Sequence, residues 1–454
     1  MIKVYGDGLD ALVTMNLILK SGCEVMHYSK TEFSGGHFRG SENCGANFDL
    51  GMVLLEPDFN VNKSRDVIAY DGEFGRDSRV FLPEVFKWLE SKVGELGIHP
   101  VYVQLTSGEL VSDYFISDSL EFLKTLDKEC KSQLKDRLVE VMTDSLVGGE
   151  LHPSLKMNSQ LAANTPLVEV LQIVFGHDLY CKFFKPFIEK LTGVSAPLVS
   201  ARDNRRAWMP NFYPESILQE LWNENDYEKF KLKPLQFLRP TQLQIAEFTT
   251  MLEVENRSHP NYHRKEFVES TTDYDLTAKD KITFCNVYDF TKQQKENYDF
   301  IKNFSRYFDN PENSFSNSLH LTHFCVSDCQ PRTVFILSDE TQAVRYSLYK
   351  TKKNASFSLE SVSGEKSGKD LGLEVLSSLG IDPTCEGHSQ KMSLKVIRTP
   401  FNLQEWNDFL NQVKLHFEAL NQNLFLIHPE ANNFNDNLLR GLAAFRKREK
   451  IACH

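Results

Sequence analysis

The sequence has no hydrophobic run long enough to cross a membrane and no excess of basic residues. No apolar run in the chain reaches the ~18 residues that a membrane helix needs, so we expect no membrane span. The formal net charge of −11 argues against a nucleic-acid partner, because phosphate binding needs a basic face. The chain begins directly with a predicted strand, so we expect no signal peptide.

Cysteine and histidine are too scattered to predict a metal centre. The nine cysteines occur singly, and the closest pair, Cys325 and Cys329, has no second pair to complete a zinc site. His320 and His323 fall on an alternating strand and therefore point to opposite faces. A G-x-S-x-G elbow and a P-loop motif are both missing. Unpatterned cysteines in a chain without a leader fit the reducing cytoplasm.

The 454 residues are enough for two or three domains, and their pattern changes along the chain. It begins as strand–helix–strand, becomes mostly helical after residue 117, strand-rich after 236, and ends in a strand and a helix. This order predicts an α/β fold in which both chain ends close one domain. We predict a Rossmann-like domain from 1–75 and 395–454, a mostly helical insertion at 76–235, and a strand-rich substrate or cap region at 236–394.

The first turn has the spacing of a dinucleotide-binding loop. The three small positions of a G-x-G-x-x-G/A motif are held by Gly6, Gly8 and Ala11. Glycines let backbone N–H groups approach a pyrophosphate, and the following helix N-terminus favours its charge. Asp7 and Asp10 oppose this, since their carboxylates repel a diphosphate unless they point away. Ser29 stands where such units end their second strand with an acid that binds a ribose hydroxyl.

The next segment, SGGHFRGSENCGANFDLGMVL, combines a Gly-Gly turn, a basic residue and an F-D-x-G turn. This combination resembles the flavoproteins of the amine oxidase, protoporphyrinogen oxidase and UDP-galactopyranose mutase group. In that group the Gly-Gly turn passes under FAD, and the F-D-x-G segment lies near the isoalloxazine ring. The resemblance implies FAD as the cofactor. It implies cofactor contacts at Gly35, Gly36, Arg39, Asp49 and Gly51.

Three later segments are similar to the mutase-like branch of this group. Residues 174–193 follow its aromatic helix pattern with two differences. Thr192 replaces an aromatic residue before the last glycine, and Phe187 replaces a tyrosine after the proline. Residues 208–221 resemble its Y-P-x-G-G segment, with Ser216-Ile217 in place of the glycines. Residues 342–350 resemble the strand whose arginine faces substrate or flavin. The substrate-binding candidates that the resemblance implies are Tyr180, Phe184, Lys190, Tyr213 and Arg345.

The C-terminal residues 423–449 are similar to the strand, turn and helix that close the FAD site in the same group. The resemblance implies cofactor contacts at Asn435, which is placed to cap the helix, and at Leu438. The turn has His428-Pro429 where the group has Gly-Asp, and proline removes one N–H donor from a phosphate-binding turn.

Three functions remain open from these residues. The first is an FAD-dependent oxidoreductase or mutase-like enzyme acting on a small metabolite, such as a sugar or nucleotide sugar of polysaccharide biosynthesis. The second is a binding or structural protein that kept the scaffold and lost FAD, because Ser29, Ser216-Ile217 and His428-Pro429 all replace expected cofactor contacts. The third is an NAD(P)-dependent oxidoreductase, since Lys30 beside Ser29 can pair with a 2′-phosphate. We favour the flavoenzyme.

Overall fold

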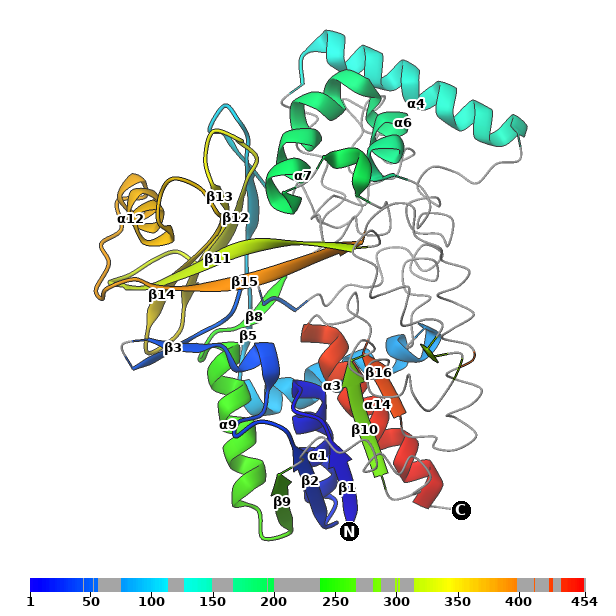
Figure 1. Ribbon diagram of the computed structural model, residues 1–454, viewed down its shortest axis with the longest axis vertical. Helices are drawn as coiled ribbons and strands as arrows, with labels where there is room; N and C mark the ends of the chain where they lie inside the picture. The colour runs from blue at the N-terminus through cyan, green and yellow to red at the C-terminus, as the bar shows by residue number, and fades with distance from the viewer. Residues whose placement is uncertain are drawn as a thin grey trace.

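The protein consists of a parallel sheet with its helices, a larger mixed sheet and a group of helices, as shown by a computed structural model (Figure 1). The structure describes residues 1–43, 45–51, 53–55, 75–112, 126–148, 166–193, 195–199, 237–266, 281–286, 299, 301–302, 314–397, 412, 424–427 and 434–452. Within these ranges no helix is both long enough and apolar enough to span a bilayer.

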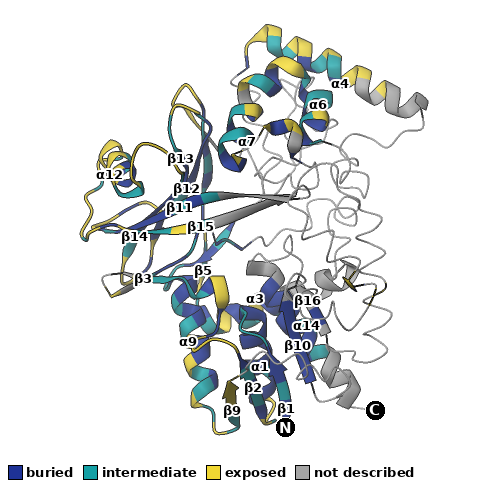
Figure 2. Ribbon diagram, viewed as in Figure 1, coloured by how far each residue is buried: buried dark blue, intermediate teal, exposed yellow. Residues whose placement is uncertain are grey.

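The parallel sheet has five strands in the order β16-β10-β1-β2-β9, and every neighbouring pair is parallel. Its strands are β1 (Ile2–Tyr5), β2 (Val25–Ser29), β9 (Tyr262–Glu266), β10 (Lys281–Asn286) and β16 (Leu424–Ile427). The outer strand β9 is exposed along most of its length (Figure 2). The sheet therefore takes strands from the start, the middle and the end of the chain.

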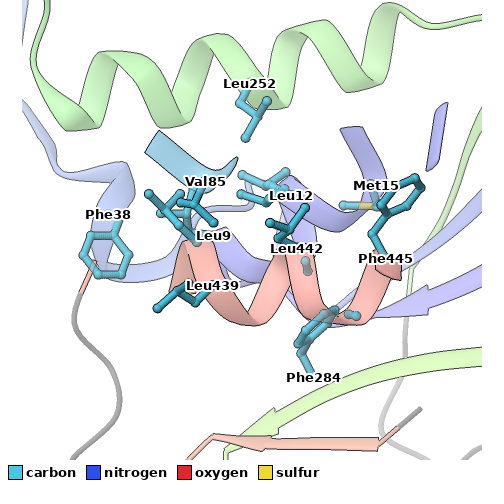
Figure 3. Close-up of a cluster of buried hydrophobic side chains, with 14 of the residues drawn as sticks. Leu9, Leu12, Met15, Phe38, Val85, Leu252, Phe284, Leu439, Leu442 and Phe445 are labelled. Carbon is cyan, nitrogen blue, oxygen red and sulfur yellow. The ribbon is translucent and has the colours of Figure 1, made fainter. Parts of the chain in front are cut away.

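Four helices share one apolar core with this sheet: α1 (Leu9–Lys20), α3 (Gly75–Val93), α9 (Ile245–Ser258) and α14 (Phe434–Ala452). Helix α1 is apolar around most of its circumference, because it packs against both α9 and α14. Leu12 of α1 lies between Leu252 of α9 and Leu442 of α14 (Figure 3). Burying each such leucine contributes about 1.5–3 kcal/mol.

Glycine allows α1 and α14 to approach closely. A Cβ atom on Gly441 would lie 2.7 Å from the Cβ atom of Val13 and 2.8 Å from the carbonyl oxygen of Asp10. The Thr14 hydroxyl also donates to the Gly441 carbonyl at 2.9 Å. The C-terminal helix is thus fastened to the first helix of the chain.

The larger sheet has seven strands in the order β15-β11-β14-β13-β12-β6-β7. Its strands are β6 (Val101–Gln104), β7 (Leu110–Ser112), β11 (Ser314–Val326), β12 (Arg332–Ile336), β13 (Ala343–Lys350), β14 (Ala355–Val362) and β15 (His388–Ile397). Only the β12–β6 pair among them is parallel, so the sheet is mixed. Helix α12 (Gly368–Ser378) packs against β11, β14 and β15.

The group of helices at the top of Figure 1 shares a second core with the mixed sheet. It contains α4 (Lys128–Gly148), α6 (Leu167–Leu179), the π-helix η4 (Tyr180–Phe184), α7 (Lys185–Thr192) and the 3₁₀ helix η5 (Ala196–Leu198). Phe175 and Phe184 pack with ring centroids 4.7 Å apart. Gly176, at φ 77°, breaks the regular helix just before η4.

Two short antiparallel pairs are also present, β3 (Ser41–Asn43) with β4 (Ala46–Phe48), and β5 (Leu96–Ile98) with β8 (Leu238–Pro240). The segment boundaries expected from the sequence differ from this arrangement at two places. Strands β9 and β10 belong to the parallel sheet, although they fall in the strand-rich region 236–394. Strands β6 and β7 belong to the mixed sheet, although they fall in the helical region 76–235.

Candidate functional site

The two predicted glycine turns meet in space. The Gly35 N–H donates to the Asp7 carbonyl at 2.7 Å, and Gly8 and Gly35 form an isolated parallel bridge. Gly6 (φ 132°) and Gly36 (φ 55°) adopt backbone conformations that side chains disfavour. The structure therefore brings together four of the residues that the sequence assigns to the cofactor.

Helix α1 starts at this junction with a glycine at its N-cap position. Its N-cap residue is Gly8, which offers no side chain to the first N–H groups. Asp10 in the first turn is fully buried, and its Oδ2 atom accepts a hydrogen bond from Arg440 Nε at 2.8 Å. Its Oδ1 atom accepts from the N–H of Ala11 at 2.9 Å. The negative charge of Asp10 is thus paired by α14 and does not stand alone beside the turn.

Asp7 reaches from the first turn to the end of β2. Its Oδ1 atom accepts a hydrogen bond from Ser29 Oγ at 2.5 Å, and its Oδ2 atom accepts from the Lys30 N–H at 2.9 Å. The Ser29 hydroxyl is also placed 2.6 Å from the carbonyl oxygen of Thr31. Ser29 is completely buried, whereas the Asp7 side chain is 19% exposed. A carboxylate therefore lies one hydrogen bond from the position where the sequence lacks one.

Arg39 follows the Gly-Gly turn in the 3₁₀ helix η1 (Gly36–Arg39). Its guanidinium forms an ion pair with Glu253 of α9 and lies over the Phe33 ring, 4.2 Å from the centroid. Glu253 also accepts a hydrogen bond from the Ser34 N–H at 2.8 Å. Arg39 holds the Gly-Gly turn against α9, and its side chain remains 29% exposed.

Gly51 lies beside a buried ion pair of the mixed sheet. Arg345 on β13 pairs with Glu360 on β14, with Nε and Oε1 3.1 Å apart, and both residues are buried. A Cβ atom on Gly51 would lie 2.9 Å from the Glu360 Oε1 atom. The Tyr349 hydroxyl donates to the Gly51 carbonyl at 3.2 Å. The structure thus joins the F-D-x-G segment to the strand arginine.

His37 lies in the same region and was not among the residues expected from the sequence. Its side chain is accessible to solvent, yet surrounding protein desolvates it enough to lower its pKa. The Leu50 carbonyl and the charges of Glu360 and Asp49 act in the opposite direction. These influences place His37 close to both the F-D-x-G segment and the Arg345–Glu360 pair of the mixed sheet.

Asp49 makes contacts that hold the fold together. Its Oδ1 atom accepts from the N–H of Ala246 at 2.7 Å at the start of α9, and Arg239 pairs with its Oδ2 atom. Both charged side chains are buried. Arg239 also lies 3.5 Å from the centroid of the Tyr349 ring. The carboxylate is therefore engaged by protein groups that anchor the F-D-x-G segment.

Solved structures of low sequence identity share this architecture. A reduced UDP-galactopyranose mutase has a TM-score of 0.60 at 14% identity, covering 100% of this chain and 94% of that chain. Cyclohexylamine oxidase from Brevibacterium oxydans IH-35A has 0.51 at 10% identity, covering 100% and 99%. The chain has the fold of UDP-galactopyranose mutase and of the amine oxidases. The resemblance inferred from the motifs is confirmed at the level of the fold.

The same mutase and amine oxidase fold occurs in a fatty acid isomerase from P. acnes that produces CLA. Its TM-score is 0.53 at 10% identity, and the match covers 98% of each chain. No protein-family model matches the sequence. A search of curated proteins likewise found no match.

Three of the candidates for substrate binding lie within or against the helical core of this fold. Tyr180 and Phe184 are almost completely buried in that core, and burial raises the pKa of Tyr180. Lys190 Nζ donates to the carbonyl oxygens of Ile336, Ser338 and Ala343 at 2.7, 2.7 and 2.9 Å. Lys190 thereby ties α7 to the β12–β13 connection, and burial lowers its pKa to about 7.

Of the C-terminal cofactor candidates and the remaining substrate candidate, the structure describes only the first group. Leu438 is 1% exposed in the core shared by α1 and α14. Asn435 lies at the start of α14. Tyr213, the pair Ser216-Ile217 and the pair His428-Pro429 lie outside the described residues.

Sequence reasoning missed three groups that the structure brings to the glycine turns and the ion pair. His37 carried a signal, because it directly follows the Gly-Gly turn. Asp7 was expected only to repel a ligand, since its contact with Ser29 depends on how the turn folds over β2. Glu360 carried no sequence signal, and its pairing with Arg345 follows from the register of β13 and β14.

Proposed function

We propose that this protein is an FAD-dependent enzyme that acts on a small metabolite. The adenine dinucleotide would lie along the junction of the Gly6–Gly8 turn with the Gly35–Gly36 turn. Its ring would reach the region where His37 lies near the Arg345–Glu360 pair of the mixed sheet. The observation that carries the proposal is the contact of the two glycine turns in front of the α1 N-terminus, whose N-cap residue, Gly8, has no side chain.

The described residues fit a diphosphate at this junction. A Cβ atom on Gly36 would have only the Asp7 carbonyl oxygen and the Gly8 Cα atom nearby, both at 3.9 Å, so open space lies beside the turn. Asp10, which repels an anion if unpaired, is neutralised by Arg440. Asp7 turns toward Ser29 and away from the first N–H groups of the helix. These three features weaken the electrostatic objection raised by the sequence, although the Asp10 Oδ1 atom itself lies beside Gly8, where it accepts a hydrogen bond from the Ala11 N–H.

At the proposed flavin-ring end of the site, the chain supplies polar side chains. A bound flavin would provide hydride and electron transfer chemistry. His37 is accessible, and its lowered pKa leaves it neutral at pH 7, so it can accept a proton or a hydrogen bond from a ligand. Glu360 and Arg345 hold each other in a fixed position behind Gly51. This arrangement suits a polar substrate of small size.

A sugar or nucleotide sugar is the substrate class we propose. The UDP-galactopyranose mutase named above has a TM-score of 0.60, against 0.53 for the isomerase and 0.51 for the oxidase. The motif at 174–193 and Arg345 supported the same branch from the sequence. Identifying the ligand that binds near His37 would distinguish a redox reaction from a mutase-like one.

Two measurements test the proposal. The purified protein should show flavin absorbance, or the apoprotein should quench the fluorescence of added FAD on binding. FAD should also raise the melting temperature by mass action more than NAD or NADP does. A colourless protein whose fluorescence and melting temperature respond to no flavin would refute the proposal. A response to NADP alone would favour the nicotinamide alternative.

A matched pair of variants tests whether FAD binds beside the Gly-Gly turn. Gly36 (φ 55°) and Gly22 (φ 84°) share a conformation that strains alanine, and a Cβ atom added at either position would have no neighbouring atom closer than 3.9 Å. Gly36→Ala puts its methyl group beside the cofactor turn, whereas Gly22→Ala puts one in the α1–β2 connection. We expect Gly36→Ala to weaken FAD binding about tenfold or more, corresponding to about 1.4 kcal/mol, and Gly22→Ala to leave it unchanged.

A further inference from the structure

The end of strand β2 lacks the acid that normally recognises a ribose, yet a carboxylate from another segment lies one hydrogen bond away from that position. In dinucleotide-binding units an acidic residue near the end of the second strand accepts hydrogen bonds from ribose hydroxyls. Ser29 holds that position here, and its side chain is completely buried. The Asp7 Oδ1 atom lies 2.5 Å from the Ser29 Oγ atom.

We propose that Asp7 supplies the ribose-binding carboxylate of this protein, with Ser29 positioning it. This inference rests on the proposed nucleotide site and names the residue that recognises the adenosine half of its ligand. The ligand class is an adenosine diphosphate unit with free 2′- and 3′-hydroxyl groups.

The geometry leaves Asp7 able to accept further hydrogen bonds. A carboxylate has about four acceptor positions, and Ser29 and Lys30 occupy two of them among the described residues. The Asp7 side chain is 19% exposed, so solvent and a ligand can reach it. The Ser29 and Lys30 donors hold both oxygen atoms in place, which lowers the entropy cost of binding a hydroxyl pair.

The surrounding charges keep this carboxylate compatible with a nearby anionic ligand. Arg264 on the edge strand β9 donates to Ser29 Oγ at 3.3 Å and also to the Thr31 carbonyl. Its positive charge therefore lies at the same end of β2 as Asp7. The diphosphate itself would lie at the α1 N-terminus, on the other side of the turn from the β2 end that Asp7 contacts.

The test is a titration of the full-length protein by isothermal calorimetry with ADP and with 2′,3′-dideoxy-ADP. Asp7→Asn should weaken ADP binding about 10- to 100-fold, the range expected for losing hydrogen bonds to a charged group. The same variant should bind dideoxy-ADP as well as the wild type does, or slightly better, because it removes a negative charge near a diphosphate. Glu32→Gln is the control: it removes a neighbouring exposed charge and should not weaken either nucleotide.

A second variant moves the carboxylate back to the strand. In Asp7→Ser combined with Ser29→Asp, the hydroxyl and the carboxylate exchange places, and ADP binding should recover relative to Asp7→Asn. An equal loss of both nucleotides in Asp7→Asn would overturn the inference while leaving the nucleotide site standing. Absence of ADP and FAD binding in the wild type would overturn the proposed function and this inference together.

Discussion

The buried pair Asp10–Arg440 should be the most sensitive ionic contact in the parallel-sheet region. Both side chains are 0% exposed, and the Arg440 Nε atom lies 2.8 Å from the Asp10 Oδ2 atom. Arg440→Met leaves the Asp10 carboxylate buried without its cation. Breaking a buried pair in this way costs about 3–5 kcal/mol, because the remaining charge has lost both water and its partner.

A second ion pair made by α14 serves as the matched control. Arg446 pairs with Glu84 of α3, and these side chains are 39% and 40% exposed. Solvent screens such a pair, so Arg446→Met should cost at most about 1 kcal/mol. The two substitutions are chemically identical and lie on one helix, which isolates the effect of burial.

Urea unfolding followed by circular dichroism measures the difference. With an m-value of about 3 kcal/mol/M, Arg440→Met should lower the transition midpoint by about 1 M or more, and Arg446→Met by about 0.3 M or less. Combining Arg440→Met with Asp10→Leu should restore much of the loss, since an apolar pair needs no counter-charge. Equal midpoints for Arg440→Met and Arg446→Met would refute the reasoning.

Three further substitutions follow from the packing. Gly441→Ala should destabilise the protein by about 1–3 kcal/mol despite the higher helix propensity of alanine, because its methyl group meets Val13 and the Asp10 carbonyl; a higher melting temperature would contradict the close helix crossing. Burial lowers the pKa of His99 to about 3, so the folded state keeps it neutral while the unfolded chain takes up a proton below about pH 6.5. The contribution of neutral His99 to the free energy of unfolding is therefore complete above pH 6.5 and is lost toward pH 3 at about 1.4 kcal/mol per pH unit. In His99→Asn, the free energy of unfolding should fall less steeply as the pH is lowered from 6 to 4. Lys190→Met should lower stability by about 2 kcal/mol or more because three carbonyl groups lose their donor, while FAD affinity stays unchanged. A loss of ligand binding at unchanged stability would contradict this structural role.

The local features of the two glycine turns could be predicted because they depend on short-range patterns. The apolar period of α1, the glycines at 6 and 8, and the Gly-Gly turn after β2 are set by residues within a few positions of one another. Their order also predicted the overall fold that the structural comparisons support. The chain ends closing one sheet followed from the same order, since β1 and β16 both join the parallel sheet.

Contacts between distant segments were decided only by the tertiary structure. Strand β9 has the sequence YHRKE, which has no apolar alternation, and it becomes a strand because β2 offers it a parallel edge. The resemblance implied a cofactor contact at Asp49, and only the structure shows that its carboxylate also accepts from an N–H at the start of α9 and pairs with Arg239. Glu360 became part of the site through the register of two strands.

The carboxylates of the first turn show most clearly what the sequence determined and what only the tertiary structure decided. Sequence alone determined that Asp7 and Asp10 lie near the expected diphosphate, and it treated both as repulsive. The fold decided otherwise, because Asp10 meets a cation 430 positions later in the chain and Asp7 meets the hydroxyl at the end of β2. The sign of a charge is written in the sequence, but its effect depends on distance and burial, which exist only once the chain has packed.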